Sequence, residues 1–161
     1  MALSKVLQNS DRFVVPGQYP SATGGDVAGS GALGEFLLAQ VDYRSPTALA
    51  SGVALNMATL TLTPGDWEIW AQFYFTAANA AAVTLTEGGV TANSGTLSTA
   101  QADPSVILPL SYTGSGAVLM AFSTGRLHIS SAASVPVYAV AKSTFTGAQT
   151  VYGALQARRV R

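Results

Sequence analysis

One eleven-residue stretch constrains the fold of this chain more than any other feature. Residues 66–76 read DWEIWAQFYFT, and every second position carries an apolar side chain. Side chains of a β-strand point alternately to its two sides, so these positions would share one side of a strand. They are Trp67, Ile69, Ala71, Phe73 and Phe75. The stretch therefore predicts a strand that buries this side in a hydrophobic core.

The opposite side of the same strand carries two large aromatic residues, Trp70 and Tyr74, among polar residues. An aromatic side chain offers about 150–250 Å² of surface, and burying it is worth several kcal/mol. Tyr138 and Tyr152 occupy the corresponding second sides of two later apolar stretches. We expect these second sides to form an interface between subunits, and the alternative is that loops of the same chain cover them.

Short stretches of similar character recur along the chain and are separated by turn signals rich in Gly and Pro. The expected strands are residues 35–41, 57–63, 66–76, 82–86, 106–110, 118–123, 126–130, 135–142 and 150–159. Turn signals include Thr-Pro-Gly-Asp at 63–66 and Glu-Gly-Gly at 87–89. Many short strands without helical periodicity predict an all-β sandwich or jelly roll over residues 35–161.

Residues 1–34 differ from the rest and predict an extended, Gly- and Pro-rich N-terminal arm. Six glycines fall within residues 17–34, and no regular periodicity continues past the apolar triplet that begins at Phe13. Such an arm is suited to gripping a neighbouring protein, which makes Phe13 a candidate partner contact. The string GSGALG at 29–34 matches G-x-G-x-x-G, but no strand precedes it and no helix follows it. A hinge is therefore expected there, and no cofactor site.

Composition excludes several classes of function. The chain has no Cys and one His, which excludes disulfide frameworks, Cys-ligated zinc and thiol catalysis. Eight Lys and Arg balance eight Asp and Glu, and so sparse a positive charge argues against nucleic-acid binding. No apolar run approaches the roughly 20 residues of a membrane span, and the N-terminus does not read as a secretory signal. Synthesis in the cytoplasm is expected.

Charged residues make up only 10% of the chain, against about 25% in a typical domain. A surface covered by other subunits would explain this shortage, and a plain Ser- and Thr-rich β protein is the alternative. Three of the charges gather at the C-terminal end, as Arg158, Arg159 and Arg161. Arginine forks suit carboxylates across an interface, so these residues are candidate partner contacts, with a solvated tail as the alternative.

Few residues are candidates for catalysis. Asp66 and Glu68 lie two apart on one side of a strand and could in principle form a glycosidase pair, but a turn residue and a solvated residue are a simpler interpretation. His128 has no nucleophile motif near it, and a structural polar role is expected. We therefore predict no catalytic, cofactor or metal site, and a protein that is not an enzyme.

Three segments resemble a group of small structural proteins and fibre-tip modules of tailed bacteriophages. They are residues 61–75 (TLTPGDWEIWAQFYF), 136–145 (PVYAVAKSTF) and 151–161 (VYGALQARRVR). The likeness covers about residues 50–161, and the group is similar to the trimeric jelly roll of the complement and tumour-necrosis-factor type. It implies a homotrimer with Trp70, Tyr74, Tyr138 and Tyr152 as candidates for the threefold interface.

The resemblance implies a non-enzymatic structural protein of the virion, made in the host cytoplasm. We expect a trimeric decoration or cement protein whose N-terminal arm grips the major capsid protein or another virion protein. The alternative is a tail or fibre-tip module that recognises a host surface glycan. A fibre protein usually carries a long shaft, and here the arm has only about 34 residues, which favours decoration. Fully extended, such an arm still reaches about 110 Å, enough to span neighbouring capsomers.

Overall fold

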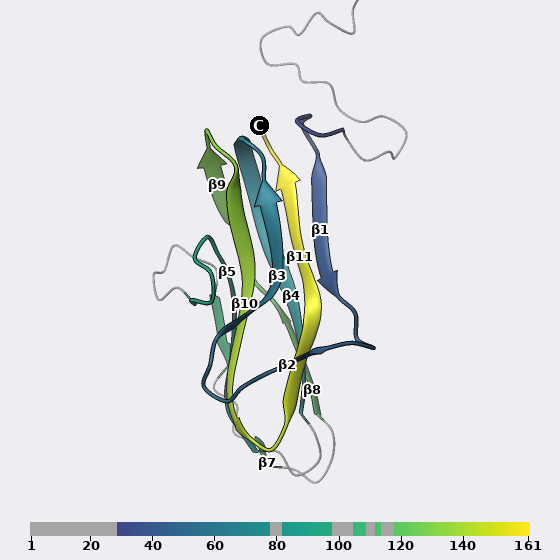
Figure 1. Ribbon diagram of the computed structural model, residues 1–161, viewed down its shortest axis with the longest axis vertical. Coiled ribbons are helices and arrows are strands. Elements are labelled where there is room, and N and C mark those ends of the chain that lie inside the picture. Colours follow the sequence, from purple (N-terminus) through teal and green to yellow (C-terminus); the bar gives the residue numbers. More distant parts are fainter. Residues whose placement is uncertain (1–28, 78–81, 98–104, 109–111, 114–117) are drawn as a thin grey trace, which may run out of the picture.

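The computed structural model describes residues 29–77, 82–97, 105–108, 112–113 and 118–161 as two antiparallel β-sheets packed face to face (Figure 1). The six-stranded sheet has the order β1 (Phe36–Val41), β11 (Gln149–Arg159), β4 (Gly65–Ala77), β8 (Val118–Ser123), with β2 (Thr47–Ala48) beside β11 and β9 (Leu127–Ser131) beside β4. The five-stranded sheet has the order β3 (Leu55–Leu62), β10 (Val135–Thr146), β5 (Ala82–Thr91), β6 (Ser105–Leu108), with β7 (Tyr112–Thr113) beside β5. The predicted all-β sandwich is confirmed.

Successive strands mostly belong to different sheets. The chain passes from β3 in one sheet to β4 in the other and back to β5, and it crosses again between β10 and β11. Each of these strands therefore pairs with a strand that is distant in sequence. The two central strands of the six-stranded sheet, β4 and β11, pair along their length, with Tyr74 opposite Tyr152 and Trp70 opposite Gln156.

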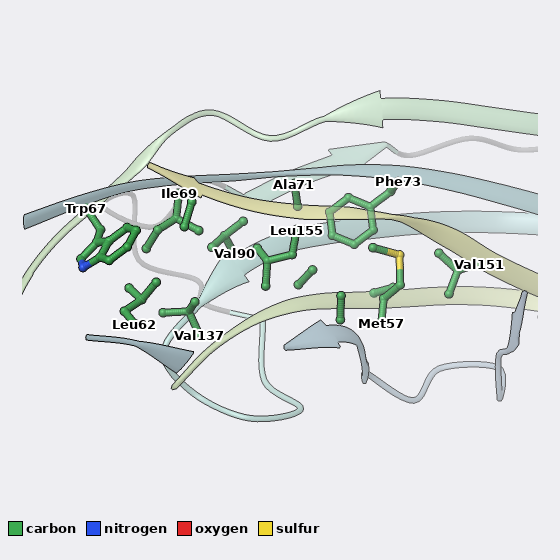
Figure 2. Close-up of a cluster of buried hydrophobic side chains, with 14 of the residues drawn as sticks. Met57, Leu62, Trp67, Ile69, Ala71, Phe73, Val90, Val137, Val151 and Leu155 are labelled. Atoms are coloured by element: carbon green, nitrogen blue, oxygen red, sulfur yellow. The ribbon is translucent and has the colours of Figure 1, made fainter. Parts of the chain in front are cut away.

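The core lies between the two sheets, and β4 supplies its largest side chains (Figure 2). The five residues predicted to share the buried side of this strand are all fully buried. Leu62 of β3, Val137 of β10 and Leu155 of β11 are also fully buried and pack into the same cluster. The alternating pattern of residues 66–76 thus predicted the buried side of β4 correctly.

The predicted turn at residues 87–89 is wrong, because β5 continues through both glycines to Thr91. A Cβ atom on Gly88 would lie 2.8 Å from the ring of Phe122 and 2.9 Å from that of Phe73. Glycine is therefore required at position 88 by core packing, because the absence of a side chain leaves room for the Phe73 and Phe122 rings.

Residues 29–34, predicted as the end of the arm, fold against the domain. Gly31 and Gly34 have φ of 82° and 86°, which favours glycine, and they form a turn ahead of β1. The Gly34 amide donates to the Arg159 carbonyl at 3.0 Å, which fastens this turn to the last strand. The rest of the predicted arm, including Phe13, lies outside the described residues. β1 begins at the same end of the sandwich as the C-terminus (Figure 1).

Candidate functional site

The outward side of the six-stranded sheet gathers most of the residues of functional interest. Strand alternation directs every second residue of β1, β4 and β11 away from the core, and the register of the ladders sets these residues in rows across the sheet. We call this surface the six-strand face. Its members on the three strands include Phe36, Leu38, Gln40, Glu68, Trp70, Gln72, Tyr74, Tyr152, Ala154, Gln156 and Arg158.

One half of the six-strand face carries a patch of large apolar side chains, which we call the apolar patch: Phe36, Leu38 and Trp70. Phe36 is 37% exposed and Leu38 50% exposed, although both are large hydrophobic residues. The Phe36 and Trp70 rings lie 6.3 Å apart between centroids, so the patch continues from the edge strand β1 to the central strand β4. Exposed apolar surface that is contiguous is typical of interaction sites.

Charged residues from β4, β11 and the start of β9 border the apolar patch. Arg126 donates to the Glu68 carboxylate at 2.6 Å, and its guanidinium lies 5.4 Å from the centre of the Trp70 ring. Arg158 pairs with Glu68 in the ladder between β11 and β4, and His128 pairs with it from β9. The Glu68 carboxylate is therefore paired with the Arg126 guanidinium. A paired carboxylate among other charged residues fits the polar rim of an interface better than one half of a catalytic acid–base pair.

Asp66, the other carboxylate considered for glycosidase chemistry, also lies near an arginine. The Asp66 carboxylate lies 3.8 Å from the Arg161 guanidinium, and the Asp66 amide donates to the Arg161 carbonyl. Asp66 therefore fastens the end of the chain to the start of β4.

The other half of the six-strand face contains a shallow depression of about 260 Å³, which we call the tyrosine groove. Its lining residues are Gln40, Val41, Asp42, Tyr43, Gln72, Tyr74, Tyr152, Gly153 and Ala154. The Tyr74 and Tyr152 rings are stacked, with centroids 5.0 Å apart and planes 8° apart. Tyr43, in the turn after β1, is 59% exposed, and its ring centre lies 6.5 Å from that of Tyr152. The groove is thus walled by aromatic rings and floored by small and polar residues.

Arg159 lies on the core side of β11 and forms a buried cluster with residues from two other segments. Its Nε atom donates to the Glu35 carboxylate at 3.0 Å, and both residues are 5% exposed. Its Nη1 donates to the Pro64 carbonyl at 2.6 Å and its Nη2 to the Thr63 hydroxyl. The guanidinium also lies 4.5 Å from the centre of the Trp67 ring. We call this cluster the Arg159 clasp.

The clasp corrects the expectation that Arg159 contacts a partner protein, because its guanidinium is engaged inside the chain. The cause is the strand alternation of β11, which points Arg159 inward and its neighbour Arg158 outward. Arg158 lies on the six-strand face, and Arg161 is exposed at the same end of the sandwich.

Three of the four predicted interface aromatics come together on the six-strand face: Trp70, Tyr74 and Tyr152. Tyr138 does not join them, because β10 belongs to the other sheet and Tyr138 lies on its outward side, paired with Thr91 and Thr59. A single flat interface on one side of the subunit cannot contain all four residues.

Sequence reasoning missed Phe36, Leu38 and Tyr43. The stretch EFLLAQV at 35–41 has an apolar residue at nearly every position, which does not indicate which side is exposed. Tyr43 follows this stretch in a turn, where a local pattern carries no information about neighbours. Only the pairing of β1 with β11 brings these residues beside Trp70 and Tyr152.

Within the described ranges, no group of three or more His, Cys, Asp or Glu side chains is arranged to hold a metal ion. The same part of the chain contains no helix that is long and apolar enough to cross a membrane. No protein-family model, curated protein or solved structure matches the chain.

Proposed function

We propose that the chain is a non-enzymatic structural protein of a tailed-bacteriophage virion, which assembles as a homotrimer and decorates the capsid. The observation that carries this proposal is the apolar patch on the six-strand face. Phe36 and Leu38 are exposed in the single subunit, and Arg158, Glu68 and Arg126 lie at one margin of the patch. An apolar centre within a charged rim is the usual anatomy of a contact between subunits.

The order of strands supports the finer assignment of the sandwich as a jelly roll. The order β1-β11-β4-β8 faces β3-β10-β5-β6, and a jelly roll likewise distributes successive strands over two four-stranded sheets. The small β2, β7 and β9 extend these sheets at their margins. A fold alone does not define function, so the jelly roll supports the virion assignment only together with the patch and the sequence resemblance.

The proposed trimeric state rests on the resemblance of the sequence to phage modules and of those modules to trimeric jelly rolls. In such a trimer, Trp70 would lie in the interface, and Tyr74 and Tyr152 would lie just outside it, beyond the row of Gln40 and Gln72. The attachment partner would be the major capsid protein or another virion protein, and residues 1–28 would provide the grip. Because β1 begins beside the C-terminus, this attachment would act at one end of the sandwich.

Quantitative mass spectrometry and immunogold labelling of purified virions test the proposal. Decoration predicts many copies per particle, with label spread over the head. Label confined to the tail end would contradict decoration and favour the fibre-tip alternative. A protein absent from purified virions would overturn both assignments.

A further inference from the structure

We propose that the tyrosine groove binds a neutral saccharide, with one sugar ring seated in the depression against the exposed Tyr43 side chain. This proposal does not depend on the virion assignment, because it rests on the groove alone. Its volume of about 260 Å³ lies just below the range of about 300–1,000 Å³ found for drug-sized ligands. A groove of this size, open to solvent, suits a small ring on a longer chain.

The aromatic walls supply the apolar part of saccharide recognition. The faces of a sugar ring carry C–H groups, and the faces of aromatic rings carry negative charge density that attracts them. The rings of Tyr43 and Tyr152 are inclined by 57°, with centres 6.5 Å apart, so they contact each other, and the more exposed Tyr43 ring offers the surface against which a sugar packs. Tyr74 stacks on Tyr152 and holds it in place.

Tyr43 is more exposed than Tyr152, and its position is supported by contacts within its own turn. The Arg44 guanidinium lies 4.9 Å from the centre of its ring. The Arg44 amide donates to the Asp42 carboxylate at 2.8 Å, which fixes the turn that carries Tyr43. The turn therefore presents the Tyr43 ring in a defined position beside β11.

The polar lining supplies partners for sugar hydroxyl groups. Gln40 and Gln72 are exposed, and each amide offers both donors and an acceptor. Asp42 adds a carboxylate, which accepts strongly from hydroxyl groups. Ala154 lies between Gln40 and Gln72 in the ladder, and its small side chain leaves space between the two amides.

The charge of the lining favours a neutral sugar. Among the nine lining residues, Asp42 is the only charged one, and it would repel an acidic sugar. The groove is separated from the apolar patch by the polar row of Gln40 and Gln72. We therefore expect subunit contacts to stop at this row and to leave the groove accessible.

An array of neutral oligosaccharides built from glucose, galactose and N-acetylhexosamines tests the proposal with the full chain. Isothermal titration then gives the affinity for each saccharide that binds. Tyr43→Ala removes one wall, and we expect it to weaken binding at least about tenfold, as loss of a central aromatic contact does. Tyr43→Phe keeps the ring and is expected to stay within about threefold of the wild type.

Tyr138→Ala is the matched control, because it removes a tyrosine from the outward side of the other sheet. We expect its saccharide affinity to equal that of the wild type. The proposal is overturned if no array member binds at millimolar concentration, or if Tyr43→Ala binds as tightly as the wild type. It is also overturned if Tyr43→Ala changes the mass of the assembly, since the groove would then be a contact between copies of the chain.

Discussion

The outward sides of the two sheets differ in the kind of environment they suit. Of the six exposed large hydrophobic side chains in the described ranges, four lie on or beside the six-strand face: Phe36, Leu38, Tyr43 and Leu119. The outward side of the five-stranded sheet instead presents exposed threonines, such as Thr59, Thr61 and Thr144, and the ion pair of Lys142 with Glu87. Threonine suits a strand that faces water. Within the described residues, the six-strand face is therefore the more apolar of the two outward sides.

The largest expected effect is the loss of assembly when the apolar patch receives a charge. Leu38→Asp places a carboxylate at the centre of the proposed interface, where it would be buried without a partner. We expect sedimentation velocity to find a folded monomer. Thr61→Asp is the matched change on the five-stranded sheet and should leave the mass of the assembly unchanged. If Leu38→Asp keeps the wild-type mass and Thr61→Asp does not, the roles of the two sides are reversed.

The next largest effect compares a residue on the core side of β11 with its neighbour on the six-strand face. Arg159→Leu leaves the Glu35 carboxylate buried without its partner, and we expect the free energy of unfolding to fall by about 3–5 kcal/mol. Arg158→Leu, one residue earlier and exposed, should change it by less than about 0.5 kcal/mol. Urea denaturation followed by tryptophan fluorescence measures both. If Arg159→Leu lowers the free energy of unfolding as little as Arg158→Leu does, the Arg159 clasp does not stabilise the domain.

A smaller effect distinguishes the tyrosines of the two sides. Tyr74→Leu removes the stack on Tyr152, which is worth about 0.5–1.5 kcal/mol beyond the buried area. Tyr138 has no aromatic ring stacked on it in the described part of the chain, so Tyr138→Leu should cost less. Both changes are best measured in the Leu38→Asp background, so that assembly does not contribute. A larger loss for Tyr138→Leu would contradict the stacking argument.

The smallest effects concern one ion pair on each side. Lys142 and Glu87 are 33% and 13% exposed, whereas Arg126 and Glu68 are 67% and 34% exposed. Because water screens the second pair more, we expect Lys142→Ala to lower stability by up to about 1 kcal/mol and Arg126→Ala by less than about 0.5 kcal/mol. Thermal unfolding at low and high salt measures both, and the difference should shrink as salt increases. A salt-independent difference would indicate packing rather than charge.

The sequence predicts much of the fold because strand alternation is a local property. Residues 66–76 indicate both the strand and its buried side, and residues 118–123 match β8 at both ends. The local pattern fails where a residue serves a distant neighbour. Gly88 reads as a turn residue, yet its role depends on two phenylalanines from other strands.

The site is less predictable than the fold for the same reason. Tyr138 and Tyr152 have almost the same local pattern, and only long-range pairing assigns them to opposite sides of the sandwich. Arg158 and Arg159 read together as one charge cluster, whereas strand alternation separates them into an exposed and a buried residue. Tyr43 has no local signal, because its neighbours in space come from β11 and β4.

The Arg159 clasp has a mechanical consequence. The chain before Gly29 enters the domain at the turn that Glu35 and Arg159 hold, so tension on that part of the chain reaches the clasp before it reaches the β1–β11 ladder. Arg159 joins Glu35 to the Thr63–Pro64 turn and to the last strand, so a pull is shared among three segments. If residues 1–28 tether the domain as proposed, the clasp would bear the load before the first pairs between β1 and β11.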